Sequence, residues 1–178
     1  LAFSWNGQWL AAAHENGDVE LWDLEERSSS CVRRTGESIS SLVFCHGTEN
    51  LVVVTVKGEL GVIDPVEHTY VAHLLDAREI GTTLAADSST GSIAIGTRSG
   101  TVMLMNPDGW TERWRAQPHT AGISSLSFSP DGTRLASASN DRTIVLSDTQ
   151  LGKPVATLLG HAYLVSCVSF SADGSRLV

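Results

Sequence analysis

The chain alternates short apolar stretches with turn-forming pairs, and this pattern predicts β-strands throughout. Between residues 119 and 160 the alternation places strands near 123–128, 134–139, 143–147 and 154–158. Two-residue turn signals separate such stretches along the chain, namely Asn16-Gly17, Lys57-Gly58, Ser99-Gly100 and Asp141-Arg142. The first three pairs place glycine at the second position, where a hairpin turn requires a positive φ. The pattern therefore predicts four-stranded antiparallel sheets.

The pattern repeats every 41 or 42 residues. One position of the repeat, which we call the anchor, is occupied by Phe3, Phe44, Ala86, Phe128 and Phe170. Seven residues after each anchor comes an apolar side chain, namely Leu10, Leu51, Ile93, Leu135 and Leu177. Twenty residues after the first four anchors come Asp23, Asp64, Asn106 and Asp148. These offsets predict complete repeats at 1–35, 36–76, 77–118 and 119–160, and a partial fifth at 161–178.

Repeats of this length and pattern predict an all-β fold, a β-propeller. A single four-stranded sheet would leave an apolar face exposed, and stacking successive sheets, or blades, around an axis buries those faces. We therefore expect four four-stranded antiparallel blades plus a partial fifth. The anchor ring of Phe128 is expected to be buried between blades.

Several motifs in these repeats resemble those of the WD-repeat, or β-transducin-repeat, family. Its signature combines a Gly-His pair with a Trp-Asp pair, and the chain contains Gly160-His161 and Leu21-Trp22-Asp23. The stretch from His119 to Asp148 is similar to a family repeat almost throughout. The resemblance is strong in repeats one, four and five and degenerate in repeats two and three.

The resemblance implies a buried hydrogen-bond chain that joins a His, a Ser or Thr, an Asp and the Trp of a repeat. Repeat four offers His119, Ser137 or Ser139, and Asp141, with Ser147 in place of the Trp. We assign the following residues to this structural network: Trp22, Asp23, His119, Ser139, Asp141, Asp148 and His161. Repeats two and three have Thr35 and Ala77 at the His position, so their blades are expected to depend on apolar packing.

Propellers of this family usually have seven or eight blades, whereas 178 residues hold just over four periods. The resemblance therefore implies an open arc of a seven- or eight-bladed parent. Because the chain opens with Leu1, its true N-terminus is expected to be missing. The remaining blades of the parent chain would be the arc's immediate partners.

Composition narrows the possible partners and compartments. Twelve Lys and Arg against 20 Asp and Glu give a net charge of -8, the wrong sign for binding nucleic acid. Cys31, Cys45 and Cys167 lack the spacing of a zinc site or a disulfide framework, which favours a reducing compartment and a cytoplasmic location. No apolar run approaches the roughly 18 residues of a membrane span. We therefore expect no nucleic acid, membrane, metal or cofactor.

Candidate catalytic groups have simpler structural explanations. No serine lies in a Gly-x-Ser-x-Gly motif, and the His, Ser and Asp residues of repeat four fit the family's network. His14-Glu15 is interpreted as part of a solvated hairpin, and His68 and His73 as surface histidines. Trp110 and Trp114 are four residues apart and are expected to share one packing face, with a binding ledge as the alternative.

The resemblance places partner contacts on a rim formed by the turn between strands two and three and by the entry to strand one. The predicted rim residues are Glu15, Ser38, Ser40, Val56, Ile80, Thr82, Arg98, Gly122, Ser124, Asn140, Leu164 and Ser166. This set mixes charges, hydroxyls, amides and aliphatic groups. It favours other proteins or peptides as partners over a charged small ligand.

Two functions remain open. The first is a non-catalytic protein-protein interaction scaffold within a larger, possibly multidomain signalling or regulatory protein. The alternative is a propeller-fold enzyme such as a lactonase-like hydrolase, because residues 61–72 resemble repeats of non-WD propellers. The scaffold is favoured, since the axial strands offer Ser, Thr, Val and Ile rather than acidic or His ligands for a metal.

Overall fold

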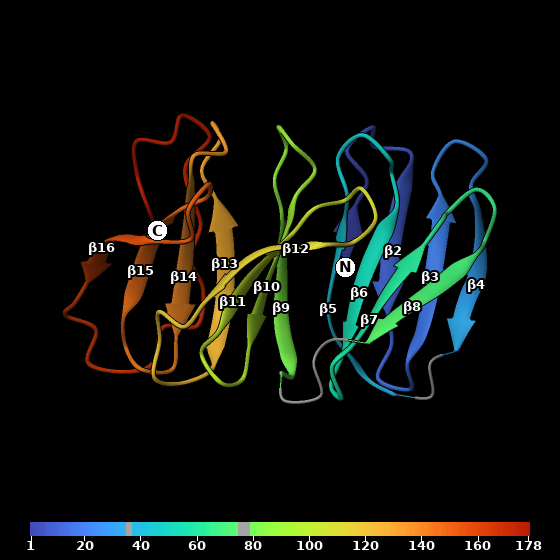
Figure 1. The fold of residues 1–178 in the computed structure, drawn as a ribbon. Helices are drawn as coiled ribbons and strands as arrows, with labels where there is room; N and C mark the ends of the chain where they lie inside the picture. The colour runs from blue at the N-terminus through green and yellow to red at the C-terminus, as the bar shows by residue number, and fades with distance from the viewer. Residues whose placement is uncertain (35–36, 75–78) are drawn as a thin grey trace.

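The structure, a computed structural model, describes residues 1–34, 37–74 and 79–178. Within these ranges the chain forms sixteen β-strands and no helix (Figure 1). The strands make four antiparallel sheets in which spatial order follows chain order. The prediction of an all-β fold with four four-stranded antiparallel blades is confirmed.

The strand bounds show the recurrence of the repeat. Blade one contains β1 (Ala2–Phe3), β2 (Trp9–Ala13), β3 (Asp18–Asp23) and β4 (Ser28–Arg34). Blade two contains β5 (Ile39–Phe44), β6 (Leu51–Thr55), β7 (Glu59–Ile63) and β8 (Tyr70–Leu74). Blade three contains β9 (Gly81–Ala86), β10 (Ile93–Thr97), β11 (Val102–Met105) and β12 (Glu112–Ala116). Blade four contains β13 (Ile123–Phe128), β14 (Arg134–Ser139), β15 (Ile144–Asp148) and β16 (Pro154–Leu158).

The repeat limits themselves remain a proposal. The boundaries at 35–36 and 76–77 lie outside the described residues, as do Thr35 and Ala77.

The hydrophobic core lies between the sheets. One cluster joins Val19 and Leu21 of blade one to Val53 of blade two, and the next joins Val54 of blade two to Ile95 of blade three. A third cluster lies between blades three and four. Every residue of β6 and β10 is buried, because these middle strands are covered by a neighbouring sheet on both faces. The apolar faces of single blades are thus buried by stacking.

Residues 161–178 begin a fifth unit without forming a full sheet. Their ladder consists of one antiparallel bridge between Phe170 and Leu177. Val165 and Val168 are buried against Ala136 and Ile144 of blade four. The partial fifth blade therefore covers part of the blade-four face.

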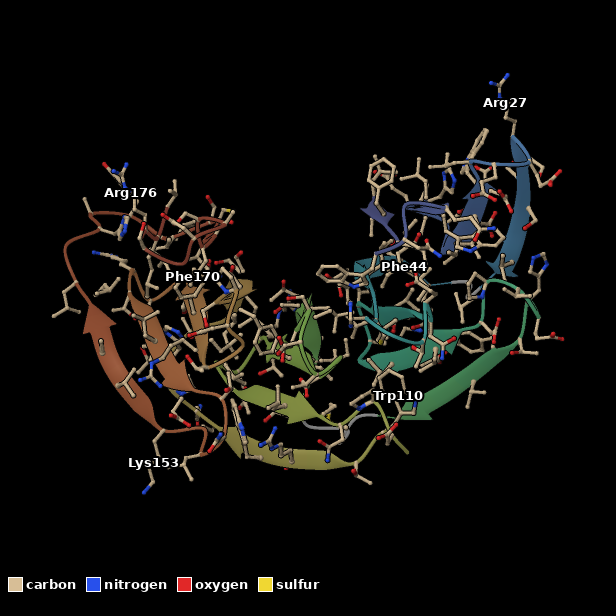
Figure 2. The ribbon with its side chains drawn as sticks, turned by 90° about the horizontal axis from the view of Figure 1, so that it is seen from above. Arg27, Phe44, Trp110, Lys153, Phe170 and Arg176 are labelled. Carbon is tan, nitrogen blue, oxygen red and sulfur yellow. The ribbon has the colours of Figure 1, made fainter. Side chains whose placement is uncertain are left out.

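Seen from above, the four blades follow one another around an arc (Figure 2). Neighbouring blades contact through their inner strands β1, β5, β9 and β13. Antiparallel order puts the first and third turns of every blade at one end of the arc, which we call the first-turn end. The second turns and the connections between blades lie at the other end, which we call the rim end.

The anchor positions are less uniform than the sequence predicts. Phe44 is 1% exposed, whereas Phe3 is 66% exposed and Phe128 is only partly buried. Phe128 therefore packs against the core between blades three and four, as predicted, but is not fully buried. Phe128 ends inner strand β13 and lines a cavity on the inner side of the arc, while its register partner Leu135 occupies the buried position.

Candidate functional site

The His119 side chain is the centre of a buried polar network in blade four. Its Nδ1 lies 3.0 Å from Asp141 Oδ2 and 3.1 Å from Thr143 Oγ1. Its Nε2 lies 2.8 Å from Ser137 Oγ. The imidazole side chain is fully buried, so both ring nitrogens are engaged inside the blade. The His, Ser and Asp side chains therefore bond one another inside blade four.

Asp141 is held ionised by its surroundings. Burial alone would raise its pKa, but hydrogen bonds from the Thr143 hydroxyl and from the amides of Thr120 and Thr143 outweigh burial, with a smaller contribution from His119. The result is a pKa of about 2. The carboxylate thus joins the β14–β15 turn to the segment that leads into β13.

Ser139 occupies a different place in this network from the one expected. His119 contacts Ser137, which lies two residues before Ser139 on the same strand, β14. The Ser139 hydroxyl instead accepts a hydrogen bond from the Asp141 amide at 3.1 Å. The Ser139 hydroxyl also lies 3.0 Å from the carbonyl oxygens of Ala121 and Gly122. Ser139 therefore fixes the turn, and Ser137 is the direct partner of the imidazole.

Two other residues assigned to the network make no such bonds within the described residues. His161 is exposed, and its side chain makes no hydrogen bond to the described residues. Trp22 is 41% exposed and its indole N–H binds none of the described residues. The His position of its repeat would precede Leu1, so the assignments of Trp22 and His161 to the network stay predictions.

The aspartates that end the third strands cap turns. Asp23 Oδ1 accepts the amides of Glu25 and Glu26, and Asp148 Oδ1 accepts the amides of Gln150 and Leu151. Asp148 also pairs with Arg134 at 3.0 Å. These local bonds lower the pKa of both carboxyl groups, led by the Glu26 amide at Asp23 and the Leu151 amide at Asp148.

At the rim end, backbone hydrogen bonds bring the predicted rim residues together in pairs. The amide of Val56 donates to the Ser38 carbonyl, that of Arg98 to Ile80, and that of Asn140 to Gly122, at 2.9, 2.9 and 3.0 Å. Blades one and two are joined at this end because the Ser38 hydroxyl donates to the Glu15 carbonyl at 2.7 Å. Each pair joins a second turn to the strand entry beside it.

Three predicted rim residues use their hydroxyls between blades. Thr82 Oγ1 lies 3.0 Å from the Gly96 carbonyl of its own blade and 2.7 Å from the Ile123 carbonyl of the next. Ser40 bonds the carbonyls of Val54 and Gly81 in the same way, and Ser124 those of Ala138 and Val165. These hydroxyls, repeated every 42 residues, connect adjacent inner strands.

The rest of the predicted rim is accessible. Val56 is 47% and Leu164 58% exposed, and the side chains of Glu15, Arg98, Asn140 and Ser166 are exposed as well. Glu15, Val56, Arg98 and Asn140 lie on second turns that the bonds described above join to a strand entry, whereas Leu164 and Ser166 belong to none of these pairs.

The remaining histidines considered in the sequence analysis form no catalytic or metal site among the described residues. His14 lies 3.4 Å from Glu20 rather than beside Glu15. His68 is exposed, and the side chain of His73 lies outside the described part. Residues 1–34, 37–74 and 79–178 contain no group of three or more His, Cys, Asp or Glu side chains able to hold a metal ion.

The two tryptophans Trp110 and Trp114 do not share one face. Trp110 packs against the core between blades two and three, whereas Trp114 packs against the core between blades three and four and donates its indole N–H to the Thr149 carbonyl at 2.8 Å. A register shift at Leu104 and Met105 and a positive φ of 54° at Trp110 break the expected alternation.

The first-turn end carries a feature that the sequence interpretation missed. A cavity of about 560 Å³ on the inner side of the arc is lined by Trp5, Leu84, Leu126, Phe128, Pro130 and Phe170, among others. Trp5 is 48% exposed, and its indole N–H donates to the Phe44 carbonyl at 3.0 Å. The sequence offered one signal for this cavity, namely the position two residues after each anchor. It is occupied by Trp5, His46, Ser88, Pro130 and Ala172.

Comparison with known proteins agrees with this architecture. The family model described as "WD domain, G-beta repeat" matches residues 1–23, 112–148 and 152–178. These segments contain Trp22-Asp23 and the His119–Asp141 network. These three segments match WD repeats.

Several curated WD-repeat proteins align along nearly the whole chain. The nuclear distribution protein PAC1-1 of Uncinocarpus reesii is 29% identical over 177 residues, covering 98% of this chain and 35% of the relative. Human Striatin-4 is 25% identical over 178 residues, covering 100% of this chain and 19% of the relative. The chain thus spans about a third or less of the length of these relatives.

A solved structure shows the same fold. A chain of "Crystal Structure of Mitotic Checkpoint Complex" superposes with a TM-score of 0.85 at 22% identity, covering 96% of this chain and 52% of that chain. The β-propeller assignment is therefore confirmed. Among the described residues, no helix is long and apolar enough to cross a membrane.

Proposed function

We propose that this chain is part of a non-catalytic protein-protein interaction scaffold, within the WD-repeat propeller of a larger signalling or regulatory protein. The observation that carries the proposal is the fixed rim end. Its turn and strand-entry backbones are hydrogen-bonded in pairs, while its side chains remain accessible. A rigid backbone with exposed, chemically mixed side chains suits recognition of another protein.

The direct partner contacts are proposed to come from Glu15, Val56, Arg98, Asn140, Leu164 and Ser166. Ser38, Ile80 and Gly122 support the turns beside them. Ser40, Thr82 and Ser124 hold blades together through hydroxyls that are already engaged. The rim therefore combines an exposed contact layer with a supporting layer.

The groups with nucleophilic potential support a non-catalytic role. His119, Ser137 and Asp141 bond one another inside blade four. Burial raises the pKa of the Cys45 thiol to about 12, which keeps it protonated at neutral pH. No described cluster of metal-ligating side chains favours the hydrolase alternative. We further propose a cytoplasmic location, which the free thiols of Cys45 and Cys167 support.

Affinity capture with the full-length protein tests the proposal. Arg98→Glu and Asn140→Lys should abolish or strongly reduce capture of its main binding proteins, without changing its thermal midpoint. Lys153→Glu, an exposed charge reversal at the first-turn end, is the matched control and should leave capture unchanged. Retained capture in both rim variants would refute the rim assignment, and hydrolysis of simple lactones or esters by the purified protein would refute the non-catalytic function.

A further inference from the structure

The cavity at the first-turn end is open and is lined mainly by aromatic and other apolar side chains, with four serines among the lining residues. Trp5, Phe128 and Phe170 come from three different repeats, and Leu84 and Leu126 lie between them. The indole N–H of Trp5 is already satisfied, so the ring offers its carbon surface and its π-face. The ring orientation is further fixed by an edge contact with His46, with centroids 5.4 Å apart. An accessible apolar concavity of this kind suits an inserted side chain.

The net negative charge of the chain is concentrated at this same end. The loops there are 4–8, 24–27, 45–50, 64–69, 87–92, 106–111, 129–133, 149–153 and 171–176. They carry nine Asp and Glu against three Lys and Arg, whereas the described rim-end loops carry four against three. The end that holds the apolar cavity is therefore strongly acidic, and the predicted rim is nearly neutral.

Two of these carboxylates lie in the turns that form the wall of the cavity. Asp131 follows Pro130, and Asp173 follows Ala172, and both preceding residues line the cavity. Their oxygens accept local bonds from Ser129 and Thr133 or from Ser171 and Ser175. Asn6 makes the same bonds in blade one, to Ser4 and to the Gln8 amide. The turn therefore needs an acceptor but no charge, so the charge is free to serve recognition.

From this combination we propose that the first-turn end docks a basic protein segment, which inserts an apolar or aromatic side chain into the cavity. Lysine or arginine side chains beside the inserted group pair with the first-turn carboxylates and stack on Trp5. This inference rests on the proposed scaffold function but assigns a second surface, opposite the rim. The acidic first-turn end would repel a nucleic acid or an anionic membrane, so the proposed partner is a basic protein segment.

A labelled peptide tests the surface directly. The probe is Gly-Lys-Arg-Leu-Phe-Arg-Lys-Gly with an N-terminal fluorescein, titrated with the full-length protein and followed by fluorescence anisotropy. Saturable binding that weakens with added salt is expected. A peptide with Glu in place of every Lys and Arg, and one with Ser-Ser in place of Leu-Phe, should each bind at least about tenfold more weakly. Equal binding of all three peptides would overturn the proposal.

Matched variants locate the binding end. Asp131→Asn and Asp173→Asn remove charge while keeping the turn acceptor, and each should weaken binding about two- to fivefold. Pro130→Lys places a cation at the cavity wall and should weaken it about tenfold. Glu37→Gln removes one charge at the rim end, outside the proposed partner contacts, and should change binding less than twofold. An equal effect of Glu37→Gln and Asp173→Asn would show that the peptide is attracted only by the net charge of the protein.

Photo-crosslinking supplies a readout independent of these variants. A probe with benzoylphenylalanine in place of Phe should label residues 84–88, 126–130 or 170–172. Labelling of the rim end, or no saturable binding at all, would refute the docking surface. Neither result would contradict the scaffold function, which is tested separately by protein capture with the rim variants.

Discussion

At the residue scale, single polar side chains act mainly by fixing turns. Asp141, Asp148 and Asp131 each accept backbone amides in the loop that follows or contains them. Such bonds favour the ionised carboxylate and lower its pKa. The consequence is a folded state whose stability depends on these groups remaining charged, which can be measured.

Asp141→Asn should make the free energy of unfolding less dependent on pH in the acid range. The folded pKa of about 2 lies below the ordinary value of 3.8, so the carboxylate stabilises the fold above that value and loses its contribution as the pH falls through about 2. The free energy of unfolding of the wild type should exceed that of Asp141→Asn by about 1–2 kcal/mol at pH 6. The gap should close between pH 4 and pH 2 in urea titrations. A gap independent of pH would contradict the ion-based stabilisation.

Glu49→Gly should stabilise the protein by about 1 kcal/mol. Glu49 has a φ of 56°, and its Oε2 is buried with no hydrogen-bond partner among the described residues. Glycine removes both costs, offset in part by its larger unfolded-state entropy. His68→Gly is the matched control, because His68 has a φ of 53° but is exposed. Thermal midpoints that rise equally in both variants would show that the buried carboxylate costs nothing.

At the element scale, neighbouring blades are joined by inner-strand hydroxyls as well as by apolar packing. Thr82→Val keeps the side-chain shape but removes bonds to the Gly96 and Ile123 carbonyls. We expect a loss of about 1–3 kcal/mol in the free energy of unfolding, because the two carbonyls lose the one hydroxyl hydrogen that they share. Thr82→Ser keeps the hydroxyl and should lose less than about 1 kcal/mol. Equal losses in urea titrations would assign the effect to the methyl group instead.

The second turn of blade three depends on glycine at one position. Gly100 has a φ of 90°, and a Cβ there would lie 2.4 Å from the His119 carbonyl oxygen. Gly109, in the third turn, has a φ of 73° but no atom within 4 Å of a Cβ. Gly109→Ala should therefore cost about 1 kcal/mol, and Gly100→Ala at least about 2 kcal/mol more. Similar denaturation midpoints for the two variants would contradict the close approach of blades three and four.

Local patterns predicted the strands well and the long-range contacts less well. The strands at 123–128 and 134–139 follow from alternation and turn residues, which are local. The faces of Trp110 and Trp114 were misassigned because a bulge changes the alternation without a mark in the sequence. The cavity at the first-turn end was missed because Trp5, Phe128 and Phe170 come from different repeats. Only the curvature of the arc places them around the same cavity.

At the scale of the whole molecule, the arc has two different free flanks. Trp22 and Phe3 are exposed on blade one, at 41% and 66%. At the other side Leu159, Tyr163 and Leu164 are exposed on the segment that follows blade four. Exposed apolar groups gathered on sheet flanks favour association, because burial of each large side chain stabilises a contact by about 1.5–3 kcal/mol.

The isolated 178-residue chain is therefore expected to self-associate. Size-exclusion chromatography with light scattering should give masses above the 19.0 kDa of one chain, with a dimer of arcs as the smallest stable species. Trp22→Glu with Tyr163→Glu places charges on both flanks and should shift the population toward the monomer, whereas Val66→Glu, an exposed apolar position in a third turn, should not. A cooperatively folding monomer of about 19 kDa at micromolar concentration would show that the flanks need no cover, and that stacking within the arc alone stabilises its blades.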